Sequence, residues 1–321
     1  MLAIACPGQG SQTPGFLAPW LELPGVREHL EQLSDRAGTD LVRHGTTSDE
    51  ETIKDTAVAQ PLIVAAGLVT ARLLLTGHTM TAATVVAGHS VGELTASAIA
   101  GALTEDDAVA FVRVRANAMA QAAAATPTGM SAVLGGDPEE VAARLADLGL
   151  TAANANGGGQ VVAAGTLEQL AGLAENPPAK ARVIALKVAG AFHTAHMAPA
   201  VTALEELRPT LTPADPTATL MSNDDGKPIA TGQGNLDSLI AQVSRPVRWD
   251  LCMESMQAMG VTGMVELSPA GTLTGLAKRG MRGTATLAVK SPEDLDAARS
   301  FIEEHSRTTD PVTAPISEGP Q

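Results

Sequence analysis

Aromatic and basic side chains are scarce in this sequence. It contains four Phe, two Trp and no Tyr, and its 21 Lys and Arg are outnumbered by 35 Asp and Glu, which gives a formal net charge of −14 at pH 7. A nucleic-acid-binding protein needs a basic stripe and aromatic faces on which bases stack. We therefore do not expect nucleic acid as a partner.

Cysteine is equally rare, with only Cys6 and Cys252. Because the two are isolated from each other and from any Cys-x-x-Cys spacing, neither a disulfide framework nor a thiolate zinc site is predicted. Such a chain suits a reducing cytoplasm. The apolar run Leu2–Cys6 is short and has no basic flank, so it predicts a first strand and not a signal peptide. We expect a cytoplasmic protein.

Long apolar runs and phosphate-binding glycine patterns are also missing. The most apolar stretch, 57–75, is interrupted by Gln60, Pro61 and Arg72, whereas a membrane span needs about 20 consecutive apolar residues. The glycine clusters at 8–10 and 157–159 neither complete G-x-G-x-x-G nor precede Gly-Lys-Ser/Thr. We expect no membrane span and no nucleotide cofactor.

The remaining composition favours a packed α/β fold. Hydrophobic residues make up 45% of 321 residues, enough for a core, and the length corresponds to about two domains at roughly 150 residues each. A long helix is predicted from Thr104, where Thr-Glu-Asp-Asp resembles a capping box, to about Ala125. Apolar runs of strand length alternate with segments of helical period; these runs are 3–6, 82–87, 160–164, 183–188 and 261–267.

The region 129–188 differs from its surroundings. It predicts a strand at 130–134, a helix at 138–148, a strand at 160, a helix at 167–174 and a strand at 183, which is the size of a small α+β subdomain. We interpret it as an insertion into a larger domain. Residues 306–321 hold three Pro and few large apolar groups, so a flexible tail is expected there.

A candidate nucleophile lies in Gly88-His89-Ser90-Val91-Gly92. The motif follows a predicted strand and precedes a predicted helix, which is the setting of a G-x-S-x-G nucleophile elbow. Two glycines permit a sharp turn that exposes the Ser90 hydroxyl, and the Val91 N–H at the helix start faces any developing oxyanion. The alternative is a glycine-rich connector with an incidental serine.

Serine needs a base, and seven histidines are available at positions 29, 44, 78, 89, 193, 196 and 305. His193 is the best placed, because it comes just after the strand predicted at 183–188, and catalytic groups of α/β sheets gather at strand ends. His89 sits beside Ser90 and is expected to line the pocket. A loop histidine can equally be an ordinary polar residue, and this alternative stays open.

Arg115 is unusual because it lies on an apolar stripe. Positions 108, 111, 115, 118 and 119 share one face of the predicted helix and read Ala, Phe, Arg, Ala and Met. Burying an unpaired charge costs several kcal/mol, so Arg115 needs an internal carboxylate or a ligand anion. The alternatives to a ligand site are therefore an internal Asp or Glu partner and an arginine side chain that reaches out to solvent.

Together these motifs resemble the malonyl-CoA:acyl-carrier-protein transacylases. The resemblance extends over about residues 2–290, with five motifs in the family's order; these are Pro7–Gln12, Gly88–Leu94, the arginine within Val112–Met119, Gly190–His193 and Pro246–Trp249. It implies an α/β-hydrolase-like domain with a mainly parallel sheet, formed by 1–128 and 189–305, and an inserted ferredoxin-like subdomain at 129–188.

The resemblance also implies roles for individual residues. Ser90 would attack the thioester and His193 would take and return its proton, while the N–H groups of Gln9 and Val91 would form the oxyanion hole. Arg115 would bind the free malonyl carboxylate. The backbone carbonyl of Gln242 would orient the histidine, and Phe192 beside it would favour malonyl over methylmalonyl, as a tendency worth about 1–3 kcal/mol.

The implied reaction moves malonyl from malonyl-CoA to the phosphopantetheine thiol of holo acyl carrier protein through a malonyl-serine, with no metal and no bound cofactor. Alternatives are a serine esterase or thioesterase, a carrier-binding module with an inactive elbow, and an acyltransferase for another extender unit such as methylmalonyl. A monomer is expected. An acidic carrier would need a local basic patch; the candidates are Lys180, Arg182, Lys187, Lys278, Arg279 and Arg282.

Overall fold

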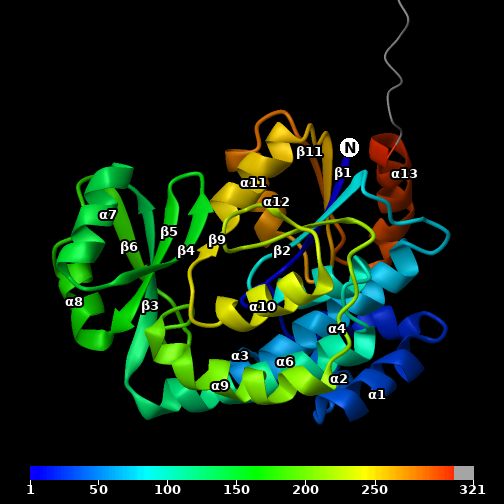
Figure 1. Ribbon diagram of the computed structural model, residues 1–321, viewed down its shortest axis with the longest axis horizontal. Helices are drawn as coiled ribbons and strands as arrows, with labels where there is room; N and C mark the ends of the chain where they lie inside the picture. The colour runs from blue at the N-terminus through cyan, green and yellow to red at the C-terminus, as the bar shows by residue number, and fades with distance from the viewer. Residues whose placement is uncertain (307–321) are drawn as a thin grey trace, which may run out of the picture.

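The computed structural model describes residues 1–306 and arranges them around two sheets (Figure 1). The larger sheet has the strand order β11-β10-β1-β2-β7-β8. All of its neighbouring strands pair in parallel except β7 and β8, so the expectation of an α/β fold with a mainly parallel sheet is confirmed. Its strands are β1 (Leu2–Cys6), β2 (Thr84–Gly88), β7 (Thr219–Met221), β8 (Pro228–Ile229), β10 (Gly263–Glu266) and β11 (Ala285–Ala288).

Both faces of the larger sheet are covered. In β1, Leu2, Ile4 and Cys6 join one apolar cluster, whereas Ala3 and Ala5 join another. This alternation is the period of two that a strand imposes, and the burial of both faces is typical of parallel sheets. The first cluster is packed by α1 (Val26–Ala37), α2 (Leu41–Thr46), α4 (Thr56–Leu74), α5 (Gly92–Ile99), α6 (Glu105–Ala125), α9 (Ala198–Leu207), α10 (Gly232–Gln242) and α13 (Leu295–Ser306), and the second by α11 (Trp249–Ala258) and α12 (Thr272–Gly280).

The remaining elements of this part are short. They are α3 (Glu50–Lys54) and four 3₁₀ helices, η1 (Ala18–Glu22), η2 (Ala195–Met197), η3 (Arg208–Thr210) and η4 (Pro292–Asp294).

Helix α4 is long and strongly apolar. By length and composition it could cross a membrane, but 78% of its most apolar window is buried inside the protein. It packs against α1, α2, α3, α5, α6 and α13. A helix that is apolar on all sides and enclosed by other helices is a core helix.

The start of α6 differs in one detail from the expected capping box. The Thr104 side chain accepts a hydrogen bond from the Asp107 N–H, at 3.0 Å, as predicted. The Asp107 carboxylate does not complete the box, because it instead accepts a bond from the Thr212 N–H at 3.4 Å. A tertiary contact has replaced the local one.

The second sheet has the strand order β6-β3-β5-β4-β9. Its elements are β3 (Thr128–Gly135), α7 (Pro138–Asp147), β4 (Thr151–Gly157), β5 (Gln160–Thr166), α8 (Leu167–Glu175), β6 (Ala181–Ala185) and β9 (Val247–Arg248). Helices α7 and α8 lie on the outer side of this sheet, at the left of Figure 1. Strand β9 comes from outside the range 129–188 and pairs in parallel with β4.

Two sequence predictions for this sheet were wrong. Strand β4 was missed, because Thr-Ala-Ala-Asn-Ala-Asn-Gly lacks the large β-branched and aromatic residues that mark strands. Strand β6 was placed at 183–188 but spans 181–185, since the chain leaves β3 after the Leu186 N–H bonds the Met130 carbonyl at 2.9 Å. Ser306 ends α13, and the rest of the expected tail lies outside the described residues.

Candidate active site

Ser90 lies in the turn between β2 and α5, in a left-handed backbone conformation with φ of 54°. The two glycines of the motif, Gly88 and Gly92, have no room for a side chain. A Cβ on Gly88 would come within 2.1 Å of the Gly92 backbone, and one on Gly92 within 2.2 Å of the Cys6 carbonyl oxygen. The two glycines are therefore needed for close approach of backbone segments, and the strained serine is held by its surroundings.

His193 lies beside Ser90, although 103 positions separate them in the sequence. Its Nε2 is 2.7 Å from Ser90 Oγ, and its Nδ1 is 2.8 Å from the backbone carbonyl oxygen of Gln242. This carbonyl can only accept, so Nδ1 carries the proton and Nε2 is free to accept one from the serine. Burial and then the nearby charge of Arg115 lower the pKa of His193 to about 3, which keeps the imidazole neutral.

Arg115 projects from α6 into the same place and is 2% exposed. Its guanidinium donates to the side-chain oxygens of Gln60 and Gln242, the latter at 3.0 Å, and its Nη2 is 3.3 Å from Ser90 Oγ. Among the described residues it forms no direct ion pair with a carboxylate. Burial lowers its pKa to about 10, a value at which it stays charged near neutral pH.

The segment that follows β1 packs on the serine turn. The segment Cys6–Gly8 packs on the elbow, where His89 N–H bonds the Cys6 carbonyl at 3.0 Å and a Cβ on Gly8 would touch the His89 carbonyl oxygen at 2.6 Å. Gln9 follows this segment and lines the same cavity as Ser90, and Val91 is the next residue after Ser90. Within residues 1–306, neither of their backbone N–H groups donates a hydrogen bond, so both are available to an incoming oxygen.

Gln9, Ser90, Arg115 and His193 line a cavity of about 710 Å³ between the two sheets. A volume of this size suits a small-molecule ligand. Phe192 is nearly buried in its wall. His89 also lines it and donates from Nε2 to Asn156 Oδ1 of β4 at 2.8 Å, so this ring nitrogen is occupied by a partner other than Ser90. Burial lowers the pKa of His89.

Sequence reasoning missed a buried polar network beneath the elbow. Asn223 accepts from the Ser90 N–H and donates to the Gly88 carbonyl, each at 2.8 Å. Glu93 accepts from the Asn223 N–H at 2.5 Å and from the Gln242 side chain, whose Nε2 also donates to the Ser90 carbonyl at 3.1 Å. Asn223 follows β7, and that position at a strand end is the one available signal.

Burial raises the pKa of Glu93 to about 8. Three neighbours act in the opposite direction, namely the Asn223 N–H, the Arg115 charge and the Gln242 amide, while Asp224 adds to the effect of burial. A carboxyl at such a position is held by specific partners and not by solvent.

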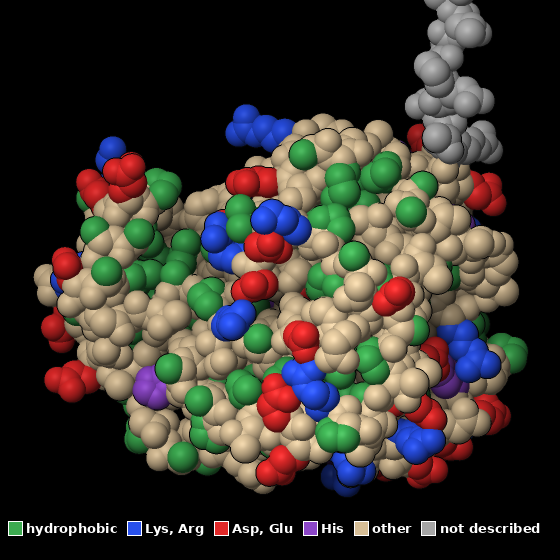
Figure 2. Space-filling model, viewed as in Figure 1, with side chains coloured by type: hydrophobic (Ala, Val, Ile, Leu, Met, Phe, Trp, Pro, Cys, Tyr) green, Lys and Arg blue, Asp and Glu red, His purple; other side chains and the backbone are tan. Residues whose placement is uncertain are grey.

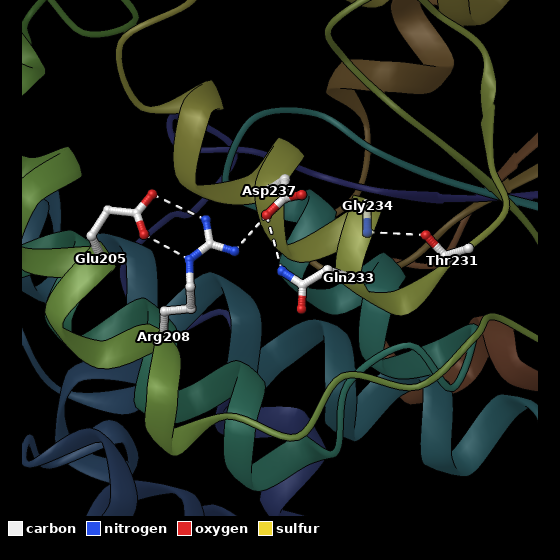
Figure 3. A network of polar contacts seen from close by, with 6 residues as sticks. All are labelled: Glu205, Arg208, Thr231, Gln233, Gly234 and Asp237. Atoms are coloured by element: carbon white, nitrogen blue, oxygen red, sulfur yellow. Dashed lines mark hydrogen bonds and ion pairs between the residues drawn. The ribbon is translucent and has the colours of Figure 1, made fainter.

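A second network joins the helix that follows His193 to the helix that carries Gln242. Figure 3 shows Arg208, after α9, between Glu205 and Asp237 of α10. The Arg208 Nε is 2.6 Å from a Glu205 oxygen, and another guanidinium nitrogen bonds Asp237. Gln233 supports Asp237 at 3.0 Å, and Thr231 caps the start of α10.

The chain is similar to known proteins over most of its length. Residues 5–309 match the family model described as the acyl transferase domain. The curated malonyl CoA-acyl carrier protein transacylase of Mycobacterium tuberculosis (strain ATCC 25618 / H37Rv) is 54% identical over 301 residues, which cover 92% of this chain and 98% of that protein.

Solved structures agree with this match. The crystal structure of MCAT from Mycobacterium tuberculosis superimposes with a TM-score of 0.89 at 53% identity, covering 93% of this chain and 99% of that one. A second structure holds a type II PKS acyl-carrier protein in complex with its malonyl-transacylase, and it matches with a TM-score of 0.86, 29% identity and coverage of 93% and 99%.

The cavity thus holds an elbow serine beside a neutral histidine, together with a buried arginine. The chain that carries them matches one enzyme family over residues 5–309. The chain belongs to the acyl transferase family, and within it to the malonyl CoA-acyl carrier protein transacylases.

Proposed function

We infer that this protein transfers the malonyl group of malonyl-CoA to the phosphopantetheine thiol of holo acyl carrier protein through a malonyl ester on Ser90. The observation that carries the inference is the Arg115 guanidinium, which lies 3.3 Å from Ser90 Oγ and forms no ion pair with a carboxylate of the described residues. A cation held beside a nucleophile suits an acyl group that ends in a carboxylate.

In the first half-reaction, Ser90 Oγ attacks the thioester carbonyl as its proton passes to His193 Nε2. The oxyanion of the tetrahedral intermediate accepts hydrogen bonds from the Gln9 and Val91 N–H groups. The C–S bond then breaks, and His193 returns the proton to the departing coenzyme A thiolate. The Gln242 carbonyl holds the Nδ1 proton throughout, in the place that an acidic residue takes in a serine triad.

The second half-reaction repeats these steps in reverse with the carrier thiol. His193 takes the thiol proton, the sulfur attacks the serine ester, and Ser90 leaves with that proton. The thioester substrate is already reactive, and the serine, histidine and N–H donors supply the base and the charge stabilisation. For these reasons we propose that no metal and no bound cofactor takes part.

The acyl group is selected at two points. Arg115 binds the malonyl carboxylate, and Phe192 limits the space beside the acyl C2, which disfavours a methyl branch by about 1–3 kcal/mol. A serine esterase or thioesterase is not favoured, because such an enzyme has no use for a buried cation beside its acyl group.

The carrier protein is the expected macromolecular partner, in line with the solved carrier complex of a similar transacylase. Figure 2 shows acidic and basic side chains mixed over β9 and α11, where Arg248 pairs with Asp250 at 2.9 Å. Because the charges on that surface are mixed, we propose that the carrier docks instead at the six exposed basic residues named from the sequence. Two of them, Lys187 and Arg279, line the cavity.

We further propose that the larger sheet forms an α/β-hydrolase-like domain over 1–128 and 189–305. The element order β3-α7-β4-β5-α8-β6 supports the assignment of 129–188 as a ferredoxin-like subdomain. A cytoplasmic monomer remains our expectation, and sedimentation of the purified protein at several concentrations measures its oligomeric state.

Intact-mass measurement tests the reaction. Malonyl-CoA should add one malonyl group to the protein, Ser90→Ala should take up none, and His193→Ala should acylate slowly. Holo carrier proteins of fatty acid and polyketide type should then remove the label. Wild-type protein that stays unlabelled, or Ser90→Ala that labels normally, would contradict the proposal.

A further inference from the structure

Among the described residues, Glu93 is a buried carboxyl group near Arg115 that the proposed mechanism leaves unused. Glu93 lies in the first turn of α5 and is 3% exposed, but it does not touch the guanidinium. Its carboxylate bonds the Gln242 side-chain nitrogen, and the Gln242 side-chain oxygen accepts from Arg115 at 3.0 Å. The guanidinium and the carboxyl group are thus linked through one amide.

An amide has a donor end and an acceptor end, so its orientation is set by what it meets. Both carboxyl oxygens of Glu93 act as acceptors here, one for the Asn223 N–H and one for Gln242 Nε2, and a guanidinium can only donate to the amide oxygen. Glu93 and Arg115 therefore select the same orientation of the Gln242 amide. The second amide on Arg115, that of Gln60, has no such partner, because its nitrogen faces the sulfur of Met119 at 3.5 Å.

Resting on the proposed function, we propose that Glu93 is a positioning residue, which fixes the side-chain amide of Gln242 and thereby holds the Arg115 guanidinium toward the acyl group on Ser90. Gln242 is suited to this task, since its main-chain oxygen also binds His193 and its Nε2 binds the Ser90 carbonyl. The charged and titratable groups that face Glu93 are Arg115, Asp224 and Cys252.

Glu93 also accepts from the Asn223 N–H, and a purely structural role would act through that contact. The two roles differ in what they change. Loss of elbow support slows acylation by every acyl-CoA, whereas loss of Arg115 orientation slows acylation by malonyl-CoA alone. The informative quantity is therefore the ratio of kcat/KM for acylation by malonyl-CoA to that by acetyl-CoA.

In Glu93→Gln the new side chain places its own NH₂ against that of Gln242 or against the Asn223 N–H, so the Gln242 orientation is no longer unique. We expect the malonyl-to-acetyl ratio to fall about tenfold or more, as for loss of one charge-assisted hydrogen bond. Gln242→Met should lower the ratio equally, and the double variant should lower it no further.

Glu266→Gln is the matched control. Glu266 is a fully buried carboxylate of β10 that accepts from three N–H groups at the start of α12 and contacts neither Arg115 nor Gln242. Its variant should lose stability and keep the ratio within about twofold. Labelling of Ser90 by a fluorophosphonate reports elbow integrity in each variant, independently of the acyl group.

An unchanged ratio in Glu93→Gln, or losses that add fully in the double variant, would overturn the proposal. If Glu93→Gln does not fold, Glu93→Asp replaces it; its shorter carboxylate withdraws from Gln242, so the ratio should fall partway, and an unchanged ratio again refutes the role. Arg115→Ala serves as the reference. Failure of wild type to form a malonyl-enzyme counts against the proposed function instead.

Discussion

Two arginines of this protein meet opposite environments. Arg208 is 28% exposed and bonds two carboxylates directly, Glu205 and Asp237, as Figure 3 shows. Arg115 is 2% exposed and bonds two neutral amides and a hydroxyl. Their pKa values shift in opposite directions, upward for Arg208 through its acidic partners and downward for Arg115 through burial.

The difference separates a structural cation from a functional one. The charge of Arg208 is satisfied within the fold, and its contacts tie α9 to α10 near the surface, where ion pairs contribute little. The charge of Arg115 is desolvated at a cost of several kcal/mol and meets dipoles only. A bound ligand anion would offset this desolvation cost by pairing with the Arg115 guanidinium.

Replacement of Arg115 by alanine should give the largest effect. We expect kcat/KM for malonyl-CoA acylation to fall about 100-fold or more, because a charge-assisted, two-pronged contact is lost. Acetyl-CoA acylation should change only a few-fold. Stopped-flow or quenched acylation with both substrates measures this, and equal losses would contradict a carboxylate contact.

Arg115→Lys should have an intermediate effect. Lysine keeps the charge, but one ammonium group cannot hold Gln60 and Gln242 and also bind a carboxylate with two parallel bonds. We expect the malonyl-to-acetyl ratio to fall about tenfold. The same assay checks it, and full activity in this variant would show that charge alone is sufficient.

The pH dependence of acetyl-CoA acylation should respond to substitution of Arg115 but not of Arg208. With the pKa of His193 near 3, the rate should stay constant as pH falls through 6.5 and should decline only at lower pH, where the imidazole takes up a proton. Since Arg115 helps to depress this pKa, Arg115→Met should move the decline to higher pH. Arg208→Ala should leave the profile in place; a wild-type decline near 6.5 would refute the expectation.

Arg208→Ala should have the smallest effect. Its partners are partly exposed, so we expect a loss of unfolding free energy below about 1 kcal/mol, reduced further by salt, and acylation within about twofold of wild type. Urea denaturation at low and high ionic strength measures the first quantity. A malonyl-specific loss in this variant would remove the distinction between the two arginines.

The parts of the site that have a local sequence signature could be predicted. The glycines around Ser90 mark a tight turn, and Arg115 stands out on an apolar helix face. The small sheet was anticipated without β4, whose alanines and asparagines give no strand signal. In the larger sheet, the apolar runs marked β1, β2 and β10, whereas the short strands β7, β8 and β11 were not predicted.

Contacts between distant positions could not be predicted in this way. Glu93 and Gln242 lie 149 positions apart, and Asn223 and Ser90 lie 133 apart. The Gln242 carbonyl is invisible to any pattern, since every residue has one, and it was named only through the family resemblance. Nor does the sequence show that Arg115 is met by amides and not by an acid, because that depends on which helices come together.

The pairing of β4 with β9 has a consequence for the cavity between the two sheets. Asn154 and Ala155 pair with Val247 and Arg248 through main-chain bonds, so a strand of one sheet is fastened to the chain that leads into α11. The walls on either side of the serine cannot swing apart as a hinge without breaking those bonds. The separation of the two sheets across the cavity is therefore held partly by a main-chain connection and not by side-chain packing alone.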